Sequence, residues 1–426
     1  MATARTVAVE AIRRVTDEGA YSTLVVPTLL ARARLGERDR ALATALAFGT
    51  LRHLPGLDRA IGLRATRSVT RMSPGARAAL RIGAYQLLFM RIPAHAAVSE
   101  SVGLATPRER GFVNAILRRL SDDPPPPPIG ETDEDVGART GLAPWAVREL
   151  RVLLGDEAEP AAEAFGERGL LCLRANTCRT SVGSLAESLR AGGHDPRPST
   201  IHPDCLLLDA GDPARLSGFA QGWFAVQDHA SAFVTEALDP QPGERVLDVC
   251  AGPGGKAAHV ACLVGETGAV VAGDVHPDRT GPIRSIAERL GVRIQVVAQD
   301  ATHPAVRGGF DRVLVDAPCS GIGSARRRPE LLWRPRKEDL SGLARLQVRI
   351  ATSAADLLRP GGRLVYSVCT FPRAETDAAC DALVRHRPEL EPLAIAGPDG
   401  PAERVRLWPH RHGSDGMFVA AFTKRA

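Results

Sequence analysis

The 426-residue sequence predicts a multidomain protein with an all-α N-terminal domain, a small α+β module and a C-terminal α/β domain of the Rossmann-like class. Three observations predict this fold. The chain is too long for one typical core. Five consecutive prolines, Pro124 to Pro128, interrupt it after a helical region. From about residue 244, buried strands alternate with helices, which is typical of a parallel sheet covered on both faces. We therefore expect domains at 1–123, 129–235 and 236–426, with 124–128 as a linker.

The N-terminal domain has the composition and the spacing of helices. Ala, Leu and Arg dominate, and apolar residues recur three or four positions apart, as at Ala78, Ile82 and Tyr85. Before that run, Ser73 and Pro74 predict a helix start with serine as the N-cap. The prolines that follow the domain favour a stiff, extended spacer.

The middle and C-terminal regions contain strand patterns. In the middle, strands at 170–174 and 205–208 flank a helix at 184–191, and another helix covers 145–154. In the C-terminal region a helix at 340–358 precedes Pro360-Gly361-Gly362. The strands predicted there are 245–250, 268–274, 293–300, 311–316, 363–369 and 416–424.

Composition excludes several classes of protein. Hydrophobic residues make up 44% and charged residues 24%, as in ordinary globular proteins. No run reaches the roughly 18 apolar residues of a membrane span, and no apolar stretch follows the early arginines as in a signal peptide. We therefore expect a cytoplasmic protein without membrane contact. The eight cysteines form no C-x-x-C pair, so neither a disulfide framework nor a metal site is expected, and most should be core residues.

Charge is concentrated at the N-terminus. Residues 1–120 contain 19 Arg, no Lys and 8 Asp or Glu, a net +11, whereas the whole chain carries +5. A solvated surface would explain this, and so would a nucleic-acid partner, because neutralised phosphates supply most non-specific affinity.

A glycine loop predicts a cofactor site. The strand at 245–250 runs into Ala251-Gly252-Pro253-Gly254-Gly255-Lys256 and then a helix, which suits close approach of a ligand. Asp274, Asp300 and Asp316 end the next three strands and should face the same crevice. Single acids at such positions often cap helices, but three in register favour a ligand site. A dinucleotide oxidoreductase stays open, although the loop does not match G-x-G-x-x-G.

Two cysteines end neighbouring strands. Cys319 lies in Asp316-Ala-Pro-Cys319 and Cys369 follows the strand at 363–369. Each alone could be a buried structural thiol. Two at one sheet edge are much harder to explain as packing, and a pair of thiols would suit covalent catalysis in which a thiolate nucleophile splits a difficult step into two easier ones. Such a thiolate needs cationic help, for which Arg326, Arg327, Arg328, Arg334 and Lys337 are candidates, although they could equally bind phosphate.

At these residues the sequence resembles the RsmB-type (Sun or Fmu) ribosomal RNA cytosine-5 methyltransferases over nearly the whole chain. The N-terminal domain resembles NusB, a fusion specific to the RsmB type. The motifs that carry the resemblance are Leu173-Arg-Ala-Asn176, Gly222-Trp-Phe-Ala-Val-Gln-Asp228, Val246-Leu-Asp-Val-Cys-Ala-Gly-Pro-Gly-Gly-Lys256, Asp316-Ala-Pro-Cys319, Tyr366-Ser-Val-Cys-Thr370, Leu407-Trp-Pro-His-Arg-His-Gly413 and, for NusB, Leu80-Arg-Ile-Gly-Ala-Tyr-Gln-Leu-Leu-Phe89, Ile92-Pro-Ala-His95 and Gly111-Phe-Val-Asn114.

The resemblance implies the cofactor S-adenosyl-L-methionine, an RNA substrate and a role for each matching residue. Cys369 would be the nucleophile, Cys319 would assist elimination and release, and Lys256 would orient the acids. Asp316 would lie between cofactor and cytosine. The target base would be unpaired or flipped out. The cofactor-binding residues would be Cys250, Ala251, Gly252, Pro253, Gly254, Gly255, Lys256, Asp274 (ribose), Arg279, Asp300 (adenine) and Asp316.

The chain departs from the family at a few positions. The family usually has Thr-Cys-Ser where this chain has Val368-Cys369-Thr370, and often Ala where it has Gly252. Ala374-Glu375-Thr376 replaces the usual Glu-Glu-Asn, and the NusB-like domain is shorter than usual over residues 102–111. No catalytic group is lost. The rival hypotheses are a non-catalytic RNA-binding or ribosome-assembly protein, the same chemistry on transfer RNA or a small molecule, and a redox or metal role for the cysteines. We expect a monomer without a metal.

Overall fold

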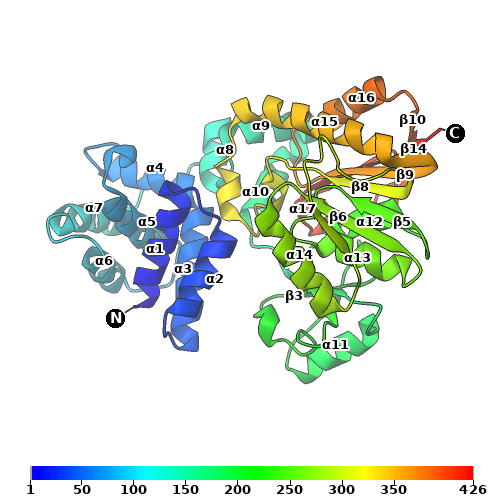
Figure 1. Cartoon of the computed structure of the whole chain (residues 1–426). Helices are drawn as coiled ribbons and strands as arrows, with labels where there is room; N and C mark the ends of the chain where they lie inside the picture. Colours follow the sequence, from blue (N-terminus) through cyan, green and yellow to red (C-terminus); the bar gives the residue numbers. More distant parts are fainter. Residues whose placement is uncertain (1, 426) are drawn as a thin grey trace. The chain divides into compact units, whose positions relative to one another are not determined.

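The computed structural model describes residues 2–425, which form two compact units (Figure 1). Unit 1 contains Met1–Arg168 and Ala325–Arg336, and unit 2 contains Gly169–Ser324 and Lys337–Ala426. The division between the units does not fall at the prolines 124–128, because the chain beyond them continues as helices of unit 1. The expected division into three domains therefore differs from the contact units and stays a prediction.

Unit 1 is all-α, as the sequence predicted. The predicted start at Ser73 is confirmed, since Ser73 Oγ accepts the Ala76 N–H at 3.2 Å. Residues such as Ile12, Leu46, Leu80 and Leu117 are fully buried between the helices. The helices are α1 (Ala4–Asp17), α2 (Ser22–Arg32), α3 (Glu37–Arg52), α4 (Leu54–Arg64), α5 (Pro74–Phe89), α6 (Ala94–Gly103), α7 (Arg110–Asp122), α8 (Asp133–Thr140), α9 (Pro144–Leu154) and α10 (Ala158–Gly166).

The segment Ala325–Arg336 is bound into unit 1 although it comes from the C-terminal half of the chain. Glu330 is fully buried and accepts the backbone N–H of Ser22 at 3.0 Å and its hydroxyl at 2.7 Å. Trp333 Nε1 donates to the Leu51 carbonyl at 2.9 Å. Arg334 donates to backbone carbonyls in α1 and just after it, among them the Val15 carbonyl at 2.8 Å. These long-range contacts make the segment part of the helical core.

Unit 2 begins with a small antiparallel sheet in the order β2-β3-β1-β4. Its core joins Leu173 and Leu206 of the sheet to Leu185 and Leu189 of a covering helix. The predicted strands at 170–174 and 205–208 and the helix at 184–191 are confirmed, whereas the helix predicted at 145–154 is α9 and belongs to unit 1. Its elements are β1 (Leu171–Ala175), α11 (Val182–Ala191), β2 (Arg197–Pro198), β3 (Cys205–Leu208) and β4 (Phe224–Val226).

The larger sheet of unit 2 has the strand order β10-β14-β9-β8-β5-β6-β7, with β13 paired to β14. Strands β5 to β9 run parallel, and β14 pairs antiparallel with β9. The order reverses between β5 and β8, and such a switch point leaves a crevice at the carboxyl ends. The strands are β5 (Arg245–Asp248), β6 (Ala269–Asp274), β7 (Gln295–Ala298), β8 (Phe310–Asp316), β9 (Leu358–Val368), β10 (Leu390–Leu393), β13 (Arg404–Leu407) and β14 (Met417–Lys424), and β11 (Ile395–Gly397) pairs with β12 (Gly400–Ala402).

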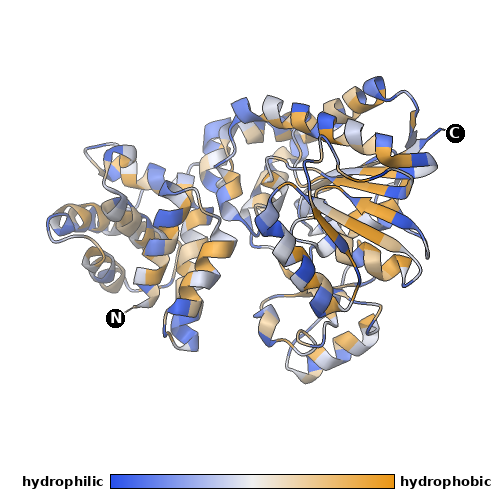
Figure 2. Cartoon of the chain, viewed as in Figure 1, coloured by the Kyte–Doolittle hydropathy of each residue, from blue (hydrophilic) through white to orange (hydrophobic). Residues whose placement is uncertain are grey.

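Helices cover both faces of this sheet. Successive strand residues enter opposite cores, so Val313 and Val315 pack with α15 and α16 while Leu314 packs with α12 and α13. The strands are accordingly mostly hydrophobic along their length (Figure 2). The helices are α12 (His229–Leu238), α13 (Gly255–Val264), α14 (Pro277–Leu290), α15 (Leu340–Leu357), α16 (Asp377–His386) and α17 (Pro409–His412).

The predicted parallel α/β domain is confirmed, with shifted ends. Strand β9 begins at Leu358 rather than at Arg363, and β7 covers only part of 293–300. Among residues 2–425, no helix combines the length and the apolar character needed to cross a bilayer.

Candidate active site

The carboxyl ends of β5, β6 and β8 place three aspartates at one edge of the sheet. Asp248 ends β5, Asp274 ends β6 and Asp316 ends β8. Burial, together with the charges of Asp316 and Asp274, raises the pKa of Asp248 to about 7. This edge therefore carries an excess of negative charge, which favours a cationic ligand.

The glycine loop is bonded to the second of these acids. Asp274 Oδ2 accepts the Gly252 N–H at 3.1 Å and Asp274 Oδ1 accepts the His276 N–H at 2.9 Å. A Cβ on residue 252 would collide with the Asp274 carboxylate, so glycine permits this approach. Arg279 NH1 lies 3.8 Å from Asp274 Oδ2. The Gly252–Pro253 peptide bond is cis, and α13 begins directly after Gly254.

Lys256 connects the loop to the third acid. Its Nζ donates to Asp316 Oδ2 at 2.7 Å, and Ser367 Oγ donates to Asp316 Oδ1 at 2.9 Å. Burial opposes the charge of Lys256, but Asp316 outweighs it, so the pKa of Lys256 is raised. The ammonium is therefore charged, and the Asp316 carboxylate is held by two donors.

Cys319 and Cys369 form a pair, with their Sγ atoms 3.5 Å apart and both side chains half-buried. A hydrogen bond from Cys319 lowers the pKa of Cys369, and Ser324 and the charge of Lys256 lower it further, against burial and Asp316. The same hydrogen bond, with burial, raises the pKa of Cys319 well above its usual range. Of the two thiols, Cys369 is therefore the one that ionises more readily, and Cys319 keeps its proton to higher pH.

The other expected site residues are less closely involved. The Asp300 side chain is 58% exposed, and its Oδ1 accepts the N–H and the hydroxyl of Thr302, both at 2.8 Å. These bonds lower the pKa of Asp300. Cys250 is half-buried at the end of β5, where burial raises its pKa. Neither residue has a hydrogen bond to the cysteine pair among the described residues.

A lysine of the glycine loop supplies a cationic charge to the cysteine pair. The charge of Lys256 contributes to the lowered pKa of Cys369. Arg326, Arg327, Arg328 and Arg334 belong to unit 1 and Lys337 to unit 2, and their expected role beside Cys319 stays a prediction.

Sequence reasoning missed two acids at the site. Asp248 lies within the quoted strand motif, and its position at the end of β5 was the available signal. Glu375 was noted only as part of a departure from the family, yet it is fully buried and accepts the Ser320 N–H at 2.8 Å. Only the folded chain brings it next to the cysteine loops.

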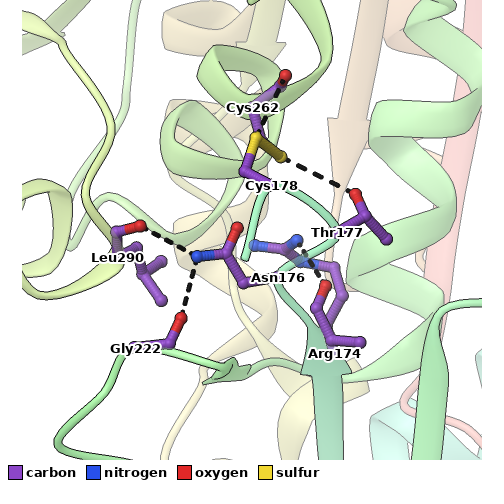
Figure 3. The surroundings of a disulfide bond; sticks show 8 residues. Arg174, Asn176, Thr177, Cys178, Gly222, Cys262 and Leu290 are labelled. Atoms are coloured by element: carbon purple, nitrogen blue, oxygen red, sulfur yellow. Dashed lines mark hydrogen bonds between the residues drawn. A yellow bond between two sulfur atoms is a disulfide. The ribbon is translucent and has the colours of Figure 1, made fainter. Parts of the chain in front are cut away.

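A disulfide joins the small sheet to the helix that follows the glycine loop (Figure 3). Cys178, just after β1, bonds to Cys262 of α13, with a Cα–Cα distance of 5.8 Å. Nearby, Asn176 Nδ2 donates to the Gly222 and Leu290 carbonyls, both at 2.8 Å. No disulfide framework was expected, and this single pair was not foreseen, because only folding brings together two cysteines that are 84 residues apart. Cys172, Cys205 and Cys380 are buried, as expected of core cysteines.

One group of potential metal ligands occurs among residues 2–425. It consists of His202, Asp204 and His259, whose ligand atoms lie within 4.8 Å of one another. His202 Nδ1 accepts the Asp204 N–H at 3.2 Å, which places the proton of a neutral ring on Nε2. Neither nitrogen of His202 then offers a free lone pair to a metal.

These features together define a class of protein. The strand order, the glycine loop and the acids at the switch point are those of a methyltransferase domain that uses S-adenosylmethionine. The residues present suit this cofactor, because its sulfonium and ammonium charges would meet the excess negative charge around Asp248.

The chain belongs to the family described as 16S rRNA methyltransferase RsmB/F, whose model matches residues 235–423. The NusB family matches residues 2–122, and the ferredoxin-like domain of RsmF/B-like methyltransferases matches 143–214. The putative methyltransferase MT1451 of Mycobacterium tuberculosis (strain CDC 1551 / Oshkosh) is 39% identical, over 99% of this chain and 96% of its own. Ribosomal RNA small subunit methyltransferase B of Vibrio cholerae is 33% identical, over 99% and 97%.

Solved structures agree with this membership. The crystal structure of PH0851 has a TM-score of 0.86 at 26% identity and covers 100% of this chain and 99% of its own. A methyltransferase homologue from Pyrococcus horikoshii has a TM-score of 0.60 at 29% identity, covering 70% of this chain and 100% of its own. The NusB-like, small and methyltransferase domains expected from the sequence are therefore all present in this family member, and its cofactor is S-adenosylmethionine.

Proposed function

We propose that the protein forms 5-methylcytosine in small-subunit (16S) ribosomal RNA through a covalent bond between Cys369 and carbon 6 of the base. The cysteine pair carries the proposal, because two thiols 3.5 Å apart, one of which ionises more readily than the other, suit addition followed by elimination. The substrate is supported by the family description and by relatives named ribosomal RNA small subunit methyltransferase B.

Cys369 is the proposed nucleophile because its pKa is the lowered one of the pair. A bond from Cys369 Sγ to carbon 6 makes carbon 5 electron-rich, so that it can take a methyl group. When bound, S-adenosylmethionine supplies that methyl group as the electrophile. Lys256 and Ser367 hold Asp316 beside the reacting groups.

Cys319 is the proposed group for elimination and release. In the free enzyme the hydrogen bond and charge of Cys369 raise the pKa of Cys319. Once the Cys369 sulfur is bonded to carbon 6, that thiolate is gone and Cys319 ionises more easily. A Cys319 thiolate then takes the proton from carbon 5, the electron pair of that C–H bond re-forms the double bond between carbons 5 and 6, and Cys369 leaves carbon 6 as a thiolate.

The cofactor-binding roles follow the sequence expectation. The segment 250–256 would hold the methionine part, Asp274 the ribose and Asp300 the adenine region, with Arg279 beside Asp274. Asp274 suits its role because it is fixed by two backbone donors. The exposed Asp300 is the least constrained member of the set.

RNA binding is assigned to the basic helical domain. Several arginines of unit 1 are used internally; Arg81, for example, bonds Asp58 with both carboxylate oxygens, at 2.8 and 2.7 Å. Others are exposed and have no ion-pair partner among the described residues, and these can neutralise phosphates. They include Arg32, Arg34, Arg38, Arg71, Arg91 and Arg108. We further propose that the enzyme is a cytoplasmic monomer and needs no metal for methyl transfer.

Methyl transfer from labelled S-adenosylmethionine to unmodified small-subunit ribosomal RNA tests the proposal, with nucleoside analysis of the digested RNA. We expect label in 5-methylcytosine with the wild type and none with Cys369→Ala. Label in another nucleoside would overturn the chemistry. Transfer to transfer RNA but not to ribosomal RNA would overturn the substrate.

A further inference from the structure

A buried carboxylate connects the two cysteine loops. Glu375 is fully buried, and its Oε1 accepts the Ser320 N–H at 2.8 Å while its Oε2 accepts the Ser320 hydroxyl at 2.6 Å. Ser320 directly follows Cys319. The Ser320 hydroxyl donates its single proton to Glu375, so Ser320 Oγ is left to accept from a neighbour.

That neighbour belongs to the other cysteine loop. Thr370 directly follows Cys369, and its Oγ1 lies 2.6 Å from Ser320 Oγ. Because Ser320 donates to Glu375, the single hydroxyl proton of Thr370 is shared between Ser320 Oγ and Glu375, to which Thr370 is also hydrogen-bonded. One carboxylate thus holds the residue after each cysteine.

A glutamine completes the arrangement from α15. Gln347 Nε2 donates to Glu375 Oε1 at 2.9 Å and to the Pro318 carbonyl at 3.0 Å. Pro318 directly precedes Cys319, so this loop is held on both sides of the cysteine. Tyr366 of β9 donates to the Glu375 carbonyl at 2.7 Å. These donors satisfy a buried group that would otherwise be costly to bury.

We propose that Glu375 is the positioning residue that aligns Cys319 with Cys369. The inference rests on the proposed function, since that function uses both thiols. It goes beyond that function by assigning the alignment to a residue that is not itself proposed to touch substrate or cofactor. Backbone bonds from Ala317 to the Ser367 carbonyl and from Gly323 to the Cys369 carbonyl also join the two loops, and the bonds to Glu375 add the side-chain constraint that keeps the sulfur atoms 3.5 Å apart.

The chain offers a matched control in unit 1. Glu330 is also fully buried and accepts the N–H and the hydroxyl of one serine, Ser22, at 3.0 and 2.7 Å. Glu375→Leu and Glu330→Leu therefore remove the same kind of bond at similar volume. Glu375→Gln keeps one acceptor oxygen and should retain part of the alignment. Ser320→Ala removes only the hydrogen bond between the Ser320 hydroxyl and Glu375, and it replaces Glu375→Leu in the experiment if Glu375→Leu does not fold.

The first readout needs no RNA. A short bifunctional thiol reagent such as dibromobimane should bridge Cys319 and Cys369 in the wild type and in Glu330→Leu, as detected by peptide mass spectrometry. In Glu375→Leu we expect the two cysteines to be modified separately. In Glu375→Gln and Ser320→Ala we expect an extent of bridging between that of the wild type and that of Glu375→Leu. Bridging in Glu375→Leu equal to that in the wild type would overturn the inference.

The second readout is turnover on RNA. Because a displacement of about 1 Å can cost about a hundredfold in rate, we expect Glu375→Leu to lose about tenfold to a hundredfold in kcat, with unchanged cofactor affinity. An equal loss of kcat in Glu330→Leu would reduce the effect to general destabilisation and overturn the inference. If the wild type forms no 5-methylcytosine while bridging still depends on Glu375, the proposed function fails and the alignment role stands.

Discussion

At the scale of single residues, the two cysteines of the site differ in how readily their thiols lose a proton. In isolation the thiols of Cys319 and Cys369 would have similar pKa values. The hydrogen bond between them lowers the pKa of Cys369 and raises that of Cys319. Lys256 favours the thiolate, whereas the Asp316 carboxylate opposes it. Pairing Lys256 with Asp316 limits that opposition, because the charge of the acid is partly compensated at 2.7 Å.

This difference in pKa predicts a pH dependence of thiol reactivity. Since the pKa of Cys369 is lowered, its thiolate fraction should reach one half at a lower pH than that of an ordinary cysteine thiol. Iodoacetamide should therefore modify Cys369 before Cys319 at neutral pH. In Cys319→Ala the hydrogen-bond donor is lost, so the inflection of the Cys369 rate should move to higher pH.

The measurement is the alkylation rate of each cysteine against pH, followed by peptide mass spectrometry in the absence of RNA. Cys172 and Cys380, which are buried, provide internal references for slow modification. Modification of Cys319 first, or an inflection that does not move in Cys319→Ala, would contradict the division of roles.

At the scale of elements, strand ends and helix starts carry the site. Hydrophobic runs that alternate with helices predicted β5, β8 and β9 as buried parallel strands, and their carboxyl ends carry Asp248, Asp316 and Cys369 or lead directly into them. The glycine loop was predictable because a strand, glycines and a helix follow one another in sequence. Local patterns therefore predicted most of the fold and the paired cysteines.

Features that depend on distant partners were not predictable from the sequence. The Cys178–Cys262 disulfide joins a loop to α13 across 84 residues, and Glu375 gains its role only beside Ser320. The placement of Ala325–Arg336 in unit 1 likewise depends on contacts with Ser22, Leu51 and Val15. No local pattern in the sequence indicates which distant residues come into contact.

The disulfide predicts a redox-dependent stability. Closing a loop between positions 84 residues apart stabilises the fold by about 4.5 kcal/mol if the effect is chain entropy alone, so reduction should lower the thermal midpoint. Protein prepared without reductant should show six free thiols under denaturing conditions. The double variant Cys178→Ser/Cys262→Ser should be insensitive to reductant. Eight free thiols, or a midpoint unchanged by reduction, would contradict the bond.

At the scale of the whole molecule, the chain crosses between its units more than once. It leaves unit 2 after Ser324, contributes Ala325–Arg336 to unit 1 and returns at Lys337. The loop that carries Cys319 is therefore continuous with a segment of the helical unit. The sequence-based boundary at the prolines separates the NusB match from the rest of the chain, but it does not separate two independent cores.

Deletion of residues 1–123 should consequently disturb a segment far along the sequence. Glu330, Trp333 and Arg334 would lose the partners that now bury or bond them. We expect faster hydrogen exchange across 325–336 in the truncated protein, while β5 and β8 keep the protection they have in the full chain. Unchanged exchange in 325–336 would show that the N-terminal domain is separable at the proline linker.

The central claim is that Cys369 bonds to the cytosine and Cys319 is needed to release it. Incubation of Cys319→Ala with S-adenosylmethionine and small-subunit ribosomal RNA, followed by denaturing electrophoresis and mass mapping of the cross-linked peptide, tests it most directly. We expect a covalent RNA–protein adduct through Cys369, which disappears in Cys319→Ala/Cys369→Ala. An adduct through another residue, or free turnover by Cys319→Ala without any adduct, would contradict the claim.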